Sequence, residues 1–239
     1  MAEQRVERSP QVVARIGGVL YLIVIVAGIL IEAAVRDKLI VSGDAAATAG
    51  NIMASQLLWR IGIAGELMAQ GCAVALALVF YVLLRPVNRN LALLAVFFNL
   101  VSIAIEVGNS LNLFDALSLL GSADYLKAFD QNQLHALSYL SLKAQGYGFG
   151  ISLVFFGCEC LVLGYLIFRS RYLPKILGVA MQIAGVCYLI NSFALFLSPA
   201  FENLIFPAVL VPSFIAESSL CLWLIVKGVN VAKWEDLRS

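Results

Sequence analysis

Four polar residues interrupt one long apolar run of this chain: Asn99, Ser102, Glu106 and Asn109. They follow one another at steps of three, four and three residues, and such steps place side chains on one face of an α-helix. A polar stripe on a helix that is otherwise suited to lipid must face protein or water, because polar groups are costly in the bilayer. A carboxyl flanked by amides and a hydroxyl suits the binding of a proton, a cation or a polar solute.

Three further carboxyls lie deep inside apolar runs, at Glu66, Glu159 and Glu217. With a helical rise of about 1.5 Å per residue, Glu66 lies roughly 13 Å from the outer end of its run. A charged side chain at the bilayer centre costs about 2.5–3.5 kcal/mol, so these groups should converge on one another, on polar partners or on water. The expected pocket is lined by Glu66, Gln70, Ser102, Glu106, Asn109, Glu159, Gln182, Asn191 and Glu217.

No basic residue stands deep in any apolar run, whereas Tyr21 supplies a hydroxyl to the first one. Carboxyls that share a site without a cation cannot all be ionised, so the pocket should hold protons, a cation or a cationic ligand. The simpler alternative is that protonated glutamates and asparagines hydrogen-bond the helices together, at about 0.6 kcal/mol per contact.

The composition places these residues in a membrane. Of the 239 residues, 62% are hydrophobic and only 13% are charged, and the mean hydropathy is +0.92. Soluble domains are about 45–50% apolar and about 25% charged. Apolar runs of about 20 residues are typical of transmembrane helices. We therefore expect an all-α, polytopic membrane protein, with the lipid bilayer as its principal partner.

Six spans are predicted, and they form a single transmembrane domain over residues 14–230 between tails at 1–13 and 231–239. A short helix is expected in each of the exterior loops at 39–56 and 121–145. The first run is too long for a signal peptide and lacks a clear cleavage site. The spans are expected at 14–35, 57–84, 91–119, 146–168, 176–197 and 204–226.

Basic residues predict the orientation, because cytoplasmic loops carry an excess of Lys and Arg. Eleven lie in the tails and the two short turns on one side, and five lie on the other side. Both termini are therefore expected in the cytoplasm, with the protein in the bacterial inner membrane. The eleven are Arg5, Arg8, Arg15, Arg85, Arg89, Arg169, Arg171, Lys175, Lys227, Lys233 and Arg238, and the five are Arg36, Lys38, Arg60, Lys127 and Lys143.

Several kinds of chemistry have no support in the sequence. A net charge of +1 argues against nucleic acid as a partner. The single histidine, His135, lies in a polar stretch, and the five cysteines fall in apolar runs, so no metal site is expected. The sequence has no phosphate-binding glycine loop, no serine-nucleophile elbow and no dinucleotide fingerprint. No cofactor is therefore expected. The oligomeric state is left open.

Four segments carry a resemblance to a known group: 43–49, 81–95, 164–170 and 173–178. The chain resembles the bacterial integral membrane proteins of domain-of-unknown-function family 4386 over residues 11–230. The resemblance implies six membrane helices and no established activity. Similar proteins often have histidine where this chain has Glu159, and aspartate where it has Asn191. That paired difference suggests that the fourth and fifth spans meet there, and it argues against a histidine-based chemistry.

Three functions remain open, and whether the protein is an enzyme is not decided. In the first, the acidic pocket binds or carries a small polar or cationic solute, or protons. In the second, the protein is structural or organises lipids, and the acids join helices. In the third, it is a membrane-embedded enzyme whose carboxyls act on a lipid-like substrate as acid and base or through a metal.

Overall fold

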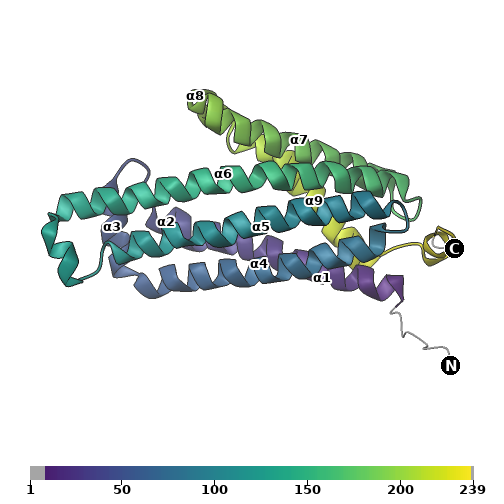
Figure 1. Cartoon of the computed structure of the whole chain (residues 1–239), viewed down its shortest axis with the longest axis horizontal. Coiled ribbons are helices and arrows are strands. Elements are labelled where there is room, and N and C mark those ends of the chain that lie inside the picture. The colour runs from purple at the N-terminus through teal and green to yellow at the C-terminus, as the bar shows by residue number, and fades with distance from the viewer. Residues whose placement is uncertain (1–8, 238–239) are drawn as a thin grey trace.

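The computed structural model describes residues 9–237, and regular secondary structure in that part is entirely helical (Figure 1). Within these residues six helices are long and apolar enough to cross a membrane. The prediction of a six-helix, multi-pass membrane protein is confirmed. The elements are α1 (Pro10–Ile31), a π-helical turn η1 (Glu32–Arg36), α2 (Asp37–Leu39), α3 (Ala45–Ala54), α4 (Gln56–Leu84), α5 (Arg89–Ser118), η2 (Asp124–Ala128), α6 (Gln131–Arg169), α7 (Lys175–Leu197), α8 (Pro199–Ile205), η3 (Ala208–Leu210), α9 (Val211–Val226) and α10 (Val231–Asp236).

The six long helices are arranged as a ring. Each packs against two others, in the order α1, α4, α5, α6, α7, α9 and back to α1. In Figure 1, α1, α4, α5 and α6 run along the long axis, and α7 diverges from that direction toward α8. The two most extensive contacts are those of α6 with α5 and with α7. Side chains that point to the inside of this ring are therefore shielded from lipid.

Three spans have limits that differ from the prediction. The fourth was expected to begin at Gly146, but α6 begins at Gln131 and is 39 residues long, or about 58 Å at about 1.5 Å per residue. Asp130 and Gln133 form a capping box that starts the helix. Its polar first part continues because Ser138, a buried residue, donates to the carbonyl of Ala116 in α5 (2.8 Å).

The first and last spans differ for local reasons as well. Pro10 occupies the first turn of α1, inside the predicted tail, where its missing N–H costs nothing. The first membrane helix then continues through η1 to Leu39. The sixth span is divided: α8 ends at Ile205, and the helical part resumes at Ala208. Residues 231–236 of the second predicted tail form α10, while residues 1–8 and 238–239 lie outside the described part of the chain.

Glycines set the close approach of α6 and α7. A Cβ atom on Gly164 would lie 2.6 Å from the carbonyl oxygen of Gly178, and one on Gly185 would lie 2.6 Å from that of Gly157. Small residues allow this kind of backbone contact between membrane helices. Gly178 and Gly185 are therefore close-packing points. The three glycines at 146–150 remain inside the continuous helix α6, where Gly148 contacts Asn109.

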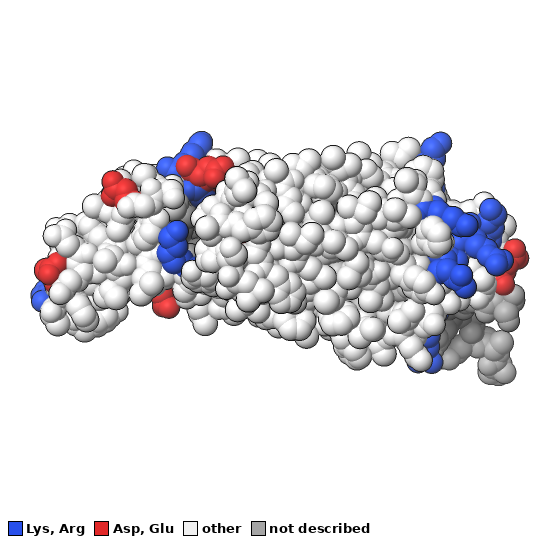
Figure 2. Space-filling view, turned by 90° about the horizontal axis from the view of Figure 1, so that it is seen from above, with Lys and Arg blue, Asp and Glu red and all other residues white. Residues whose placement is uncertain are grey.

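The two ends of the bundle differ in charge. Figure 2 shows Lys and Arg gathered at one end, a mixture of acidic and basic residues at the other, and no charged side chain over the middle of the visible face. The first of these, here called the basic end, contains the α4–α5 and α6–α7 turns and α10. There Gln11 near the start of α1 donates to the carbonyl of Lys227, which follows α9 (2.9 Å). The beginning and the end of the described chain therefore lie together at the basic end.

Candidate functional site

The polar stripe of α5 faces α6 along its length. Asn109 donates to the carbonyl of Gln145 (2.8 Å), and Ser102 donates to the carbonyl of Ser152 (3.1 Å). The hydroxyl of Ser152 donates to a carboxyl oxygen of Glu106. All of these side chains are buried. The stripe thus binds a neighbouring helix, and most of its hydrogen-bonding capacity is used between α5 and α6.

Asn99 makes the remaining contact of the stripe. Its Nδ2 donates to Oε2 of Glu159 in α6, at 2.6 Å. The exposed fractions of the two residues are 7% and 4%. The other amide atom of Asn99, Oδ1, is buried and has no hydrogen-bond partner among the described residues. Since buried polar atoms are normally bonded, this oxygen is one place where the interior can accept a donor.

Arg36 is the positively charged partner of a second group of acids. Its Nη2 lies 2.9 Å from Oε2 of Glu66 in α4, and its Nη1 lies 3.4 Å from Oε2 of Glu32. Arg36 also interacts electrostatically with Glu106, as does Glu66. We call Arg36, Glu66 and Glu106 the arginine cluster. No basic residue stands deep in an apolar run, but Arg36 reaches Glu66 from the end of the first span.

A π-helical turn accounts for this reach. Residues Glu32–Arg36 form η1, so the first span does not end in front of Arg36 but continues past it. Single π-helical turns are rare and change the face that the following side chains present. Val35 packs on Gly62 in α4 within this turn, and Arg36 extends toward Glu66.

Glu217 is held by two tyrosines from two other helices. Tyr21 in α1 donates to its Oε2 (2.9 Å), and Tyr188 in α7 donates to its Oε1. Phe80 meets the Tyr21 ring edge-on at a centroid distance of 6.0 Å, and Phe156 packs against Tyr188 at 5.2 Å. The carboxyl of Glu217 therefore joins α1, α7 and α9 inside an aromatic environment.

Glu159 and Glu217 are close enough to interact electrostatically; we call them the central pair. Within residues 9–237 neither forms an ion pair with Lys or Arg. Two carboxylates at this depth repel each other and lose hydration, so at least one must be neutralised. A proton or a bound cation is the chemistry that this arrangement can support.

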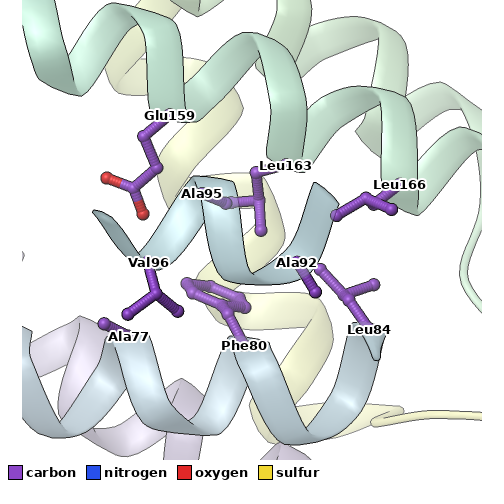
Figure 3. A pocket seen from close by; sticks show the side chains of 9 residues that line it. All are labelled: Ala77, Phe80, Leu84, Ala92, Ala95, Val96, Glu159, Leu163 and Leu166. Atoms are coloured by element: carbon purple, nitrogen blue, oxygen red, sulfur yellow. The ribbon is translucent and has the colours of Figure 1, made fainter. Parts of the chain in front are cut away.

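Two small cavities adjoin these groups. One, of about 10 Å³, lies between α4, α5 and α6, and Figure 3 shows Glu159 as the polar side chain among its nine lining residues. The other, also of about 10 Å³, is lined by Arg36 and Glu66 together with Trp59 and apolar residues. Each has room for the centre of about one water molecule. The predicted pocket residues are thus distributed over separate places, the arginine cluster and the central pair.

Ser102 and Asn109 belong to the α5 stripe, and three predicted pocket residues stand apart from that stripe and from both groups. Gln70 and Gln182 are half-buried and form no side-chain hydrogen bond with described residues. Asn191 is 5% exposed, and its Oδ1 is without a partner in the same part of the chain. The fourth and fifth spans do meet near this position, through the rings of Phe156 and Tyr188, but Glu159 itself bonds to α5.

Arg36, Tyr188 and Ser152 take part in the site although they were not predicted to do so. Arg36 stands at a span end, where basic residues are ordinary. Tyr188 and Ser152 fall in apolar runs. A signal existed for both: Tyr188 precedes Asn191 by three residues and Ser152 precedes Glu159 by seven, so each shares a helix face with a predicted pocket residue. Which neighbouring helix each would contact was visible only once the helices were placed.

Comparison with known proteins agrees with this architecture. The model for a family described as "Domain of unknown function (DUF4386)" matches residues 16–228, which include five of the membrane helices completely and most of the first. The chain belongs to the DUF4386 family. The DUF4386 match covers both the arginine cluster and the central pair.

A relative shows that this kind of chain also occurs in an archaeon. A protein of Archaeoglobus fulgidus described as "Uncharacterized protein" is 31% identical over 161 residues, or 67% of this chain and 79% of the relative. No solved structure matches. The multi-pass character of this DUF4386 member comes from its six long apolar helices, and its chemistry has to be argued from its own side chains.

The described residues offer little to a metal ion. Between residues 9 and 237 no group of three or more His, Cys, Asp or Glu side chains is placed to hold one. The five cysteines are unpaired. The donors that do converge are carboxyl, amide and phenol oxygens, which suit protons and weakly bound cations.

Proposed function

We propose that this membrane protein binds a proton or a small cationic solute in its interior, at the central pair. The observation that carries the proposal is that Glu159 and Glu217, two carboxyls inside the bundle that interact electrostatically, have no Lys or Arg partner in residues 9–237. In the arginine cluster, by contrast, Arg36 forms an ion pair with Glu66. The central pair has no such partner, so its charge must be compensated by something that the protein binds.

The aromatic rings favour a cation over an uncharged solute. Tyr21 and Tyr188 donate to Glu217, and Phe80 and Phe156 pack against these two tyrosine rings. Ring faces attract cations, and the attraction grows when the site is dry. A carboxylate beside aromatic rings is therefore suited to an ammonium group or a monovalent cation, as well as to a proton.

Thermal unfolding of the purified protein tests the proposal. The probes are sodium, potassium, methylammonium and tetramethylammonium ions, each over a range of pH. We expect at least one cation, or a change of pH, to raise the melting temperature of the wild-type protein. Glu159→Gln and Glu217→Gln should each remove that response. Asp124→Asn is the matched control, because its carboxylate is exposed and pairs only with Lys127 at the surface.

A response that survives in both glutamine variants would contradict the proposal, as would a wild-type protein that responds to neither pH nor any probe.

A structural role is the competing function, and the α5 stripe favours it. Asn99, Ser102, Glu106 and Asn109 all contact α6 through hydrogen bonds. If the buried polar residues served only to hold the helices together, the variants Glu159→Gln and Glu217→Gln would fold normally. The wild-type protein would then show no cation response. The same unfolding experiment therefore separates the two functions.

We also propose that the basic end faces the cytoplasm and that the protein resides in the cytoplasmic membrane. The gathering of Lys and Arg at that end supports this, because basic loops are retained on the cytoplasmic side (Figure 2). A single cysteine introduced at Asp124, in a cysteine-free background, should react with a membrane-impermeant thiol reagent added to intact cells. A cysteine at Lys233 should not react, and the reverse pattern would overturn the orientation.

A further inference from the structure

The cavity beside Glu159 has one polar wall, and Asn99, which is bonded to that wall, has a side-chain oxygen without a partner among the described residues. Figure 3 shows the carboxyl of Glu159 at one edge, with Ala77 and Phe80 from α4 and Ala95 and Val96 from α5 around the remaining space. Eight of the nine lining residues are apolar. A volume of about 10 Å³ is the least that accommodates a water molecule, and such a water needs two or more polar partners.

Asn99 supplies the second partner. It lies one helical turn beyond Ala95 and Val96 on α5, and its Nδ2 is fixed on Glu159 at 2.6 Å. The two amide atoms share one carbon, so Oδ1 is held beside the same carboxyl. That Oδ1 is buried and unbonded among the described residues, and the whole residue is 93% buried, being 7% exposed. A water bound here would satisfy an oxygen that the protein leaves open.

We propose that the niche formed by Asn99 Oδ1, Glu159 and the adjoining cavity is a proton site. In it, one water molecule bonds to Asn99 Oδ1 and delivers the proton to Glu159. The inference rests on the proposed function and deepens it, because it assigns the proton to Glu159 rather than to Glu217. A hydronium ion entering the niche transfers its proton to a carboxylate oxygen of Glu159. A new O–H bond forms on the carboxyl, and a neutral water remains hydrogen-bonded to Asn99 Oδ1.

The contacts of the two glutamates favour this assignment. Glu217 already receives two hydroxyl hydrogen bonds, from Tyr21 and Tyr188, and these stabilise its ionised form. Glu159 receives one, from Asn99. The ionisable groups that interact with Glu159 are Glu217 from α9 and Cys160 from its own helix. From α4 the cavity wall is made of Ala77, Phe80 and Leu84, which do not ionise.

The route to the niche is closed toward the basic end. Leu84 and Leu166, which line that side of the cavity, are buried. Beyond them Tyr172 and Trp234 both donate to the carbonyl of Leu83, at 2.6 and 2.9 Å. Exchange of the proton with water at the basic end should therefore be slow in the folded protein.

Infrared spectroscopy of the protein in lipid vesicles tests the assignment. A protonated carboxyl gives a C=O stretching band, which shifts when H₂O is replaced by D₂O. We expect such a band in the wild-type protein near neutral pH. It should disappear in Glu159→Gln and persist in Glu217→Gln. Asp124→Asn is the control, because its exposed carboxylate pairs with Lys127 at the surface, and this variant should leave the band unchanged.

A second variant tests whether a water molecule bound at Asn99 delivers the proton to Glu159. Asn99→Leu removes Oδ1 and fills the niche with a side chain of similar size. We expect the Glu159 band to lose its response to D₂O or to respond at least several-fold more slowly. If this variant does not fold, the comparison of the two glutamine variants still decides the assignment.

The outcomes separate this inference from the proposed function. A band that is lost in Glu217→Gln and kept in Glu159→Gln would overturn the inference and leave the central pair as a binding site. A band that neither substitution removes, or the lack of any band over the accessible pH range, would also overturn it. Failure of the proposed function shows itself elsewhere, as the lack of a cation or pH response in thermal unfolding.

Discussion

Arg36 and Glu66 form an ion pair between the end of the first membrane helix and the middle of the second, with 2.9 Å between Nη2 and Oε2. The exposed fractions of the two side chains are 19% and 12%, so the pair is largely removed from water. Removing one member of a buried pair leaves an uncompensated charge, and that is more costly than removing both.

The first prediction concerns this pair. Glu66→Gln should destabilise the protein by about 1–3 kcal/mol, since Arg36 would keep only the partly exposed Glu32 as a partner. The double variant Arg36→Gln/Glu66→Gln should be more stable than Glu66→Gln alone. Denaturant unfolding in detergent measures both. Strict additivity of the single substitutions would show that the pair contributes nothing to stability.

The second prediction concerns the contact between α6 and α7. Gly178→Ala would place a Cβ atom 2.6 Å from the Gly164 carbonyl oxygen, so the two helices would have to move apart. We expect a loss of about 1–3 kcal/mol, the usual range for overpacking. Gly108→Ala in α5 is the control, because a Cβ atom there meets nothing within 4 Å. Equal melting temperatures for the two variants would contradict the importance of this contact.

The third prediction concerns the carbonyl of Leu83, which accepts from both Tyr172 and Trp234 at the end of α4. The last carbonyls of a helix lack helical partners, so these donors replace them. Tyr172→Phe should cost about 1 kcal/mol or less, because the other donor remains. Trp234→Phe should cost more than Tyr172→Phe, because it also removes buried ring volume. The double variant should cost more than the sum, since it leaves the buried carbonyl without either donor. A sum that is simply additive would mean that water reaches this carbonyl.

The fold could largely be predicted from the sequence, because lipid permits few backbone arrangements. Apolar runs and helical steps predicted six spans and placed Asn99, Ser102, Glu106 and Asn109 on one buried face of α5. The limits of α6 were missed, because a polar exterior segment continues the helix once it is capped at Asp130. Hydropathy reports lipid contact and does not report where a helix begins.

The partners of the buried carboxyls were less predictable, for a physical reason. Periodicity places a side chain on a face but does not say which neighbouring helix that face meets. Glu66 pairs with Arg36 because a π-helical turn carries the first span past its expected end, and no composition signal marks that turn. Glu217 meets Tyr21 and Tyr188 because α9 closes the ring between α1 and α7.

The most direct test of the central claim is a count of protons and cations bound by the purified protein. Wild-type protein and Glu159→Gln/Glu217→Gln are titrated without buffer in matched detergent, with pH and cation activity measured together. If the central pair binds a proton or a cation, the wild-type protein should take up about one more proton or monovalent cation per chain than the double variant near neutral pH. Identical uptake by two folded proteins would contradict that claim.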